Sequence, residues 1–180
     1  MAKKGSSEQN QAAEQTGGQA QGGLDPAMLE QVAALMLLDL AAVEAYEVAL
    51  RVCKAPEITR NLKQFRDDHQ RHVTELSEAM RALGVEPPTQ PDDRSRCILS
   101  YTDVSAREDR TALVAMRGNE ELTNAAYTSA LAGALPEQLQ QLIMANWQDE
   151  RRHIEWIAEE LRTRGWELPE VPPELVVKAA

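Results

Sequence analysis

Three histidines stand in segments of this 180-residue chain where the spacing of polar side chains suits a metal site. His69 and His72 lie three residues apart, and Glu150 stands three residues before His153. Residues three apart on a helix share one face, so each pair would point in one direction. Imidazole and carboxylate groups together suit transition-metal ions. The pairs indicate a buried site if this face turns inward. If it turns outward, His69 and His72 are partly exposed surface residues.

The segments that carry these pairs have helical periodicity. Asp25 and Pro26 have the residue types of a helix start, and the apolar stripe after them predicts a helix that ends near Cys53. A second helix should follow a short break, carry the first histidine pair and end at Gly84.

The second half of the chain predicts two more helices. Residues 85–104 hold three prolines and no clear period, so we expect an irregular connection there. Ser105 and Glu108 have the capping-box spacing at which a third helix should begin, and this helix should end near the sequence GALPE. A fourth helix should end at Gly165.

The connections between the four predicted helices are short, long and short, and this order predicts how the helices are arranged. A connection of about 20 residues is long for neighbouring helices, but it can run the length of a bundle and make the second and third helices parallel. The aromatic content of 4% and the Ala- and Leu-rich helices favour an all-α protein. Two helical hairpins joined by one crossover is the ferritin-like variant of the four-helix bundle.

The two predicted hairpins repeat at a fixed offset of 81 residues. Periodicity alone would not also align the polar residues, the stop glycines and the prolines beyond them. The repeat therefore predicts an internal duplication, with matching residues facing one another across a pseudo-two-fold axis. Among the matching pairs are Tyr46 and Tyr127, Asp68 and Asp149, Arg71 and Arg152, His72 and His153, and Gly84 and Gly165.

The duplication also aligns the polar residues on the inward stripes. Three carboxylates and three imidazoles would then share one level of the core, where burial of an unpaired charge costs several kcal/mol. Mutual neutralisation or two divalent cations would offset this cost. The candidate metal ligands are Asp39, His69, His72, Glu120, Glu150 and His153.

The chain resembles the ferritin-like superfamily of ferritins, rubrerythrins and related di-iron carboxylate proteins. The resemblance rests on the stretches LDLAAVEAYEVAL, DDHQRHVTEL, NEELTNAAY and DERRHIEWI, and it covers residues 25 to about 168. Within that superfamily the stretches look most like those of small bacterial ferritin-like domain proteins. The resemblance implies two bound iron ions, with manganese or zinc as other metals, and reaction of Fe(II) with oxygen or peroxide.

Two residues depart from the family pattern of one Glu on each of two helices and Glu-x-x-His on the other two. Asp39 replaces the first Glu, and it is either a ligand or a hydrogen-bonded partner that orients a histidine. His69 replaces the Glu of the first Glu-x-x-His, and Glu44 and Asp68 are the nearby acids that could compensate for the lost carboxylate. The site would hold two ions asymmetrically, hold one, prefer zinc or manganese, or be a metal-free hydrogen-bond network.

Neighbouring residues have other interpretations. Glu121 competes with Glu120 but falls on the flank of its helix. Tyr46 and Tyr127 are expected to be core aromatics whose hydroxyls are bonded. Asp68, Arg71, Asp149, Arg151 and Arg152 are expected to form solvated or interhelical ion pairs.

Composition limits the partners. The net charge of −10 argues against nucleic-acid binding, and no apolar run of about 18 residues is present, so we expect a soluble cytoplasmic protein without membrane contact. We expect a disordered Gln- and Gly-rich tail over 1–24, the bundle over 25–168 and a Pro-rich tail over 169–180. This last tail would strap its own bundle or dock to a partner. A monomer or a homodimer is expected.

The sequence thus leaves two function classes. The first is a di-iron oxidoreductase of ferroxidase or peroxidase type, or a protein of iron handling, with no organic cofactor and no catalytic residue assigned. The second is a helical stress or interaction module without redox activity, whose polar core is metal-free or holds structural zinc.

Overall fold

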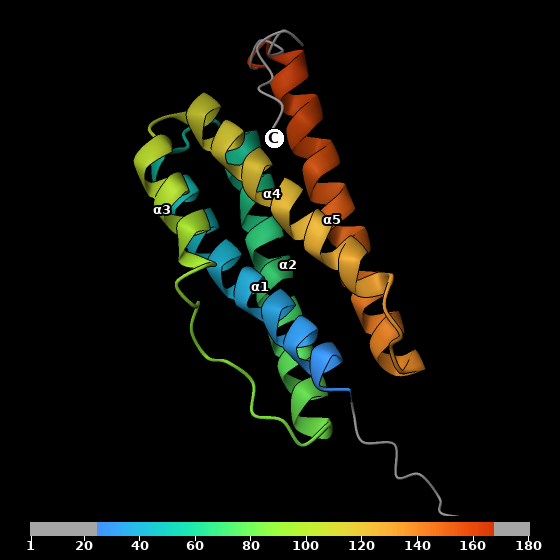
Figure 1. The fold of residues 1–180 in the computed structure, drawn as a ribbon. Helices are drawn as coiled ribbons and strands as arrows, with labels where there is room; N and C mark the ends of the chain where they lie inside the picture. Colours follow the sequence, from blue (N-terminus) through green and yellow to red (C-terminus); the bar gives the residue numbers. More distant parts are fainter. Residues whose placement is uncertain (1–24, 168–180) are drawn as a thin grey trace, which may run out of the picture.

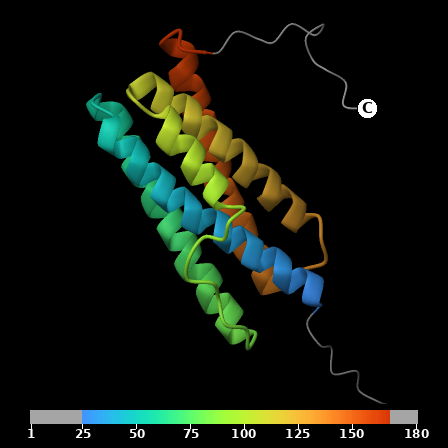
Figure 2. The same cartoon turned by 60° about the vertical axis from the view of Figure 1, so that its left-hand side comes forward.

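The computed structural model describes residues 25–167, and all regular structure in this part of the chain is helical. Four long helices pack into a bundle, and a short helix, α3, lies against the outside of α1 and α4 (Figures 1 and 2). None of the described helices combines the length and apolarity that crossing a membrane requires. The tails predicted over 1–24 and 169–180 lie outside the described residues. The helices are α1 (Pro26–Val52), α2 (Pro56–Ala82), α3 (Arg96–Ser105), α4 (Asp109–Leu131) and α5 (Glu137–Thr163).

The core consists of two apolar clusters at opposite ends of the bundle. The first contains Ile58, Leu113 and Leu161, and the second contains Met80 and Leu139. Helices α2 and α4 each begin in the first cluster and end in the second, whereas α1 and α5 run the other way. The parallel course of α2 and α4, which the long crossover predicted, is visible in Figure 1.

The helix ends follow the residues that predicted them. The Asp25 side chain accepts a hydrogen bond from the backbone N–H of Ala27 at 3.0 Å, which caps α1. Gly84 and Gly165 have φ values of +76° and +65°, the left-handed region that glycine adopts without strain. Each glycine lets the next residue donate its backbone N–H to a carbonyl in the last turn of the helix.

The crossover departs from the prediction in its second half. Residues 96–105 form α3, which turns Ile98 and Thr102 into the bundle because four residues make about one helical turn. Asn119 of α4 donates a hydrogen bond to the Thr102 hydroxyl at 2.8 Å and fixes this helix. The prolines stop before residue 92, so they leave α3 undisturbed, and its two inward residues are too few to reveal a period.

The predicted capping box is also displaced. Ser105 is the last residue of α3 and does not start the next helix. Glu108 is the N-cap of α4, and its reciprocal partner is the Thr111 side chain. At the same end of the bundle, the Asp109 carboxylate accepts the backbone N–H groups of Lys54 at 2.7 Å and Ala55 at 3.2 Å, which ties the α1–α2 turn to α4.

Two glycines should respond in opposite ways to alanine. Gly84→Ala places a side chain at positive φ and should lower the free energy of unfolding by about 1 kcal/mol. Gly118 lies inside α4, where an added Cβ would meet only Tyr101 at an ordinary 3.9 Å, so Gly118→Ala should raise it by about 0.5–1 kcal/mol. Urea denaturation measures both, and shifts of the same sign would contradict this assignment.

Candidate metal centre

The six predicted ligands lie in one layer between the two apolar clusters, and none has any exposed surface. The long helices α1 and α4 each contribute one carboxylate, and α2 and α5 each contribute two residues spaced i and i+3. That spacing puts both side chains of a pair on the inward face. We call this set the polar layer; its members are Asp39, His69, His72, Glu120, Glu150 and His153.

The polar layer contains two overlapping groups whose ligand atoms converge. In one group, atoms of Asp39, His69, His72 and Glu150 lie within 4.8 Å of one another. In the other, atoms of His69, Glu120, Glu150 and His153 do the same. His69 and Glu150 belong to both groups and therefore occupy the middle of the layer.

Several atoms that face the middle of the layer lack hydrogen-bond partners. His72 Nδ1 lies 3.3 Å from Glu150 Oε1, and His153 Nδ1 lies 3.6 Å from Glu120 Oε2, but these approaches lack hydrogen-bond geometry. Both carboxylate oxygens of Glu150 are also without a hydrogen bond. An unsatisfied buried polar group costs about 1–3 kcal/mol, and more when it is charged. These nitrogen and oxygen atoms are metal-ligand types, and cations held by the two groups would satisfy them.

The outer nitrogens of two histidines are held by aspartates of the opposite hairpin. His72 Nε2 lies 3.4 Å from Asp149 Oδ2, and His153 Nε2 lies 3.2 Å from Asp68 Oδ2. When the ring is neutral, as a metal ligand must be, a carboxylate in this position favours the proton on Nε2 and leaves Nδ1 free. At His72 the Arg71 guanidinium also lies 3.2 Å from Nε2, so Asp149 shares this position with a donor. Histidine ligands in metal sites are commonly oriented in this way.

Two arginines bridge the same aspartates. Arg71 pairs with Asp68 at 3.0 Å and also with Asp149, and Arg152 pairs with both aspartates as well. Burial alone would raise the pKa of Asp68, but His153 and the two arginines lower it to about 2. His72 and the same two arginines also outweigh burial at Asp149 and lower its pKa. Both aspartates therefore stay ionised at neutral pH and can accept hydrogen bonds from the histidines.

His69 differs from the other two histidines because both of its nitrogens face carboxylates of the polar layer. Its Nδ1 lies 2.8 Å from Asp39 Oδ1, and its Nε2 lies 3.4 Å from Glu120 Oε1. Burial would lower the pKa of His69, but Glu150, Asp39 and Glu120 together raise it well above 6.5. Burial also opposes protonation of the other two rings, but Asp39 and Glu150 raise the pKa of His72 to about 9, and Asp68 and Glu120 raise the pKa of His153. Without a bound cation, imidazolium groups are therefore the positive charge of the layer, and His69 is the one at its centre.

The carboxylates respond to this charge unequally. Burial opposes ionisation of Asp39 and Glu120, but the neighbouring histidines lower the pKa of both. For Glu150, burial together with the charges of Glu120 and Asp39 outweighs the histidines and raises the pKa. Glu150 is thus the carboxylate whose negative charge the protein alone compensates least.

Two tyrosines donate hydrogen bonds to carboxylates of the polar layer, each from α1 to α4 or from α4 to α1. The Tyr46 hydroxyl of α1 donates to Glu120 Oε1 at 2.5 Å, and the Tyr127 hydroxyl of α4 donates to Asp39 Oδ2 at 2.6 Å. Each tyrosine therefore fixes the carboxylate of the other hairpin, and their prediction as bonded core aromatics is confirmed.

The structure brings together all six predicted ligands and separates them from their competitors. Glu44 is exposed, and Glu121 pairs with Arg117 at 3.1 Å on the outside of α4. The predicted ion pairs of Asp68 and Asp149 are interhelical, but their contact with the histidines was missed. The repeated pattern Asp-x-x-Arg-His in DHQRH and DERRH was the available signal.

Removal of one buried hydroxyl tests the carboxylate network. Tyr127→Phe removes the only tyrosine hydrogen bond to Asp39 within residues 25–167 and should lower the free energy of unfolding by about 1.5–3 kcal/mol. Tyr46→Phe should act similarly through Glu120. Tyr101→Phe is the matched control, because that ring is 49% exposed and should shift stability by less than about 0.5 kcal/mol. Equal effects of all three changes in urea denaturation would argue against the network.

Comparison with known proteins finds likeness in fold only. No protein-family model matches the chain, and no curated protein matches it. Two solved structures are similar. One is a protein of Bacillus halodurans described as a candidate spore coat protein, with 14% identity, a TM-score of 0.68, and coverage of 83% of this chain and 93% of that one. The other is a hypothetical protein of Pyrococcus furiosus, with 12% identity, a TM-score of 0.59, and coverage of 78% and 92%. At such identities the likeness bears on the helical fold alone.

Proposed function

We propose that the chain is a ferritin-like protein that binds two iron ions in the polar layer and serves Fe(II) oxidation, peroxide or oxygen chemistry, or iron handling. The observation that carries this proposal is the set of unpartnered inward atoms. His72 Nδ1, His153 Nδ1, Glu120 Oε2 and both oxygens of Glu150 are buried, lack hydrogen bonds and belong to residues of the two overlapping groups. Divalent cations supply the bonds and the charge that this set needs.

The finer architecture in this proposal is two duplicated hairpins joined by a crossover that contains α3. Contacts between the hairpins support it, because they recur at the same offset of 81 residues. Tyr46 bonds Glu120 as Tyr127 bonds Asp39, and His72 contacts Asp149 as His153 contacts Asp68. The capping bonds from Val85 to Met80 and from Trp166 to Leu161 also correspond, at 2.9 and 2.8 Å.

The two groups of the polar layer assign the ligands. Asp39 and His72 would hold one ion, and Glu120 and His153 would hold the other. Glu150 belongs to both groups and has two unpartnered oxygens, so it would serve as a ligand in either group. His69 faces both groups but can donate one lone pair from a neutral ring, so it would serve one ion at a time.

Iron bound here would supply one-electron chemistry with oxygen or peroxide, which no protein side chain supplies as readily. The chain itself would do the positioning. Asp68 and Asp149 hold the outer nitrogens of two histidines, and Tyr46 and Tyr127 hold two carboxylates. The apolar clusters on both sides keep bulk water from the layer and strengthen its electrostatics.

Metal analysis tests the proposal directly. Protein purified without chelator and titrated anaerobically with Fe(II) should take up about two ions per chain. At a free Fe(II) concentration of 100 times the dissociation constant, binding should add about 2.7 kcal/mol to the free energy of unfolding per site. The double variant Glu150→Ala/His153→Ala should lose the uptake and this stabilisation.

The control is a double variant on the outside of the same helix. Glu155→Ala/Glu159→Ala removes two exposed carboxylates of α5 and should leave metal uptake unchanged. Glu150→Gln removes the same carboxylate charge with nearly unchanged side-chain shape, so metal uptake can be measured in a variant whose fold circular dichroism verifies. Absence of stoichiometric metal, together with a melting temperature that chelator does not change, would refute the proposal.

One observation favours the second function class, a bundle with a metal-free polar core. The protonated ring of His69 lies between three carboxylates and neutralises part of their charge without any metal. In that case the layer would be a structural network and the chain a non-redox stress or interaction module. A single zinc ion bound by two imidazoles and two carboxylates would be an intermediate case.

His69→Glu separates these alternatives. The change removes the central positive charge, so the metal-free protein should lose about 3–5 kcal/mol of stability. If two ions bind, the new carboxylate should strengthen the weaker site, and Fe(II) or Co(II) should restore the melting temperature. Thermal denaturation with and without metal measures this. Loss of stability that no divalent ion restores would favour the metal-free network.

A further inference from the structure

A pocket of about 740 Å³ lies outside the polar layer, between α1, the crossover with α3, and α4. None of the six polar-layer residues lines it. Its walls are mainly apolar, and its volume falls within the usual range of about 300–1,000 Å³ for small-molecule sites. The apolar side chains that line it include Ala34, Leu37, Leu38, Ile98, Leu122 and Ala126.

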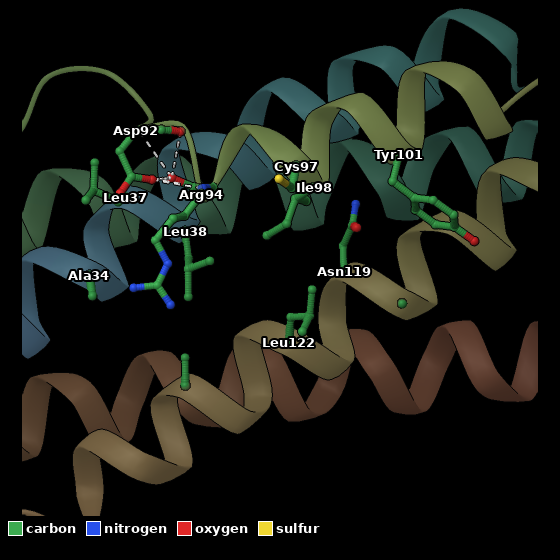
Figure 3. Close-up of a pocket in the computed structure, with 13 residues that line it drawn as sticks. Ala34, Leu37, Leu38, Asp92, Arg94, Cys97, Ile98, Tyr101, Asn119 and Leu122 are labelled. Carbon is green, nitrogen blue, oxygen red and sulfur yellow. Dashed lines mark hydrogen bonds between the residues drawn. The ribbon is translucent and has the colours of Figure 1, made fainter. Parts of the chain in front are cut away.

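The two ends of the pocket differ in chemistry. Figure 3 shows the Arg94 guanidinium beside Ala34 and Leu38 at one end, and the Tyr101 ring at the other. Tyr101 is 49% exposed and Leu122 is 55% exposed, so large apolar surface remains open to solvent at this site. Such surface, next to a hollow, is typical of binding sites.

The polar residues of the pocket differ in whether their side chains already form hydrogen bonds within the protein. Asp92 accepts hydrogen bonds from the backbone N–H of Ser95 at 2.8 Å and from its hydroxyl, so it belongs to the turn before α3. Asn119 donates to Thr102 at 2.8 Å. Arg94 has neither a hydrogen-bond nor an ion-pair partner for its guanidinium within residues 25–167. The charge of Asp92 in the same pocket acts on Arg94 without a direct ion pair, so the pocket offers a guanidinium with free N–H donors at the end of an apolar surface.

We infer that this pocket binds a small amphipathic monocarboxylate with one aliphatic chain. The carboxylate would pair with Arg94, whose planar guanidinium matches two carboxylate oxygens. The chain would lie along the apolar side chains of α1 and α4 and end near Tyr101. Gly118 supports this arrangement, because a helix-interior residue without a side chain leaves the floor of the pocket beneath Tyr101 open.

Calorimetry on the full chain with decanoate tests the inference. Decanoate should bind saturably at one site per chain. Decanol has the same chain without the charge, and decyltrimethylammonium reverses the charge. Decanol should bind about ten-fold more weakly, and decyltrimethylammonium should show no binding.

Variants connect the binding to the pocket. Arg94→Gln should weaken decanoate about ten-fold, whereas Arg96→Gln, the same change on an exposed arginine that does not line the pocket, should have no effect. Gly118→Leu should abolish binding by filling the floor. Bound decanoate should also slow alkylation of Cys97, which lines the pocket, relative to Cys53, which does not.

The inference is independent of the proposed metal centre, so Glu150→Gln should leave decanoate binding unchanged. No saturable binding of decanoate to the full chain would overturn it. Equal binding of decanoate and decanol with no effect of Arg94→Gln would also overturn it, because the pocket would then be only an apolar surface.

Discussion

The structure depends on the compensation of charge in one buried layer. Three carboxylates and three imidazoles lie without solvent contact between two apolar clusters. Each of the four long helices must present its polar residues at the same level, because displacement by one residue would rotate a side chain by about 100° around the helix and off the inward face. The chain meets this demand with partners from the opposite hairpin. Tyrosines bond two carboxylates, and aspartates hold two histidines.

This compensation is complete at the edges of the layer and incomplete at its centre. The outer nitrogens of His72 and His153 contact aspartates that are themselves bridged by arginines. The inner nitrogens of the same rings and the carboxylate of Glu150 have no hydrogen-bond partner. A network that evolved only for structure would be expected to satisfy its central groups as well. The contrast between edge and centre is the physical reason to assign a cation to this layer.

The sequence predicted much of this arrangement because charge and periodicity are local signals. Asp25, Gly84 and Gly165 mark helix ends through their own backbone chemistry, and the repeat aligned the layer residues before any contact was known. The short helix α3 was missed, because only two of its residues face the bundle. The crossed contacts of Asp68 and Asp149 and the pocket beside Arg94 were also missed, since they depend on how separate helices meet.

Anomalous diffraction at the iron edge, from crystals grown or soaked anaerobically with Fe(II), tests the central claim most directly. The account predicts two peaks inside the polar layer, one next to Asp39 and His72 and one next to Glu120 and His153. A layer without any anomalous peak, in crystals whose other contacts are unchanged, would contradict it and would leave the protonated histidines as the source of positive charge in the layer.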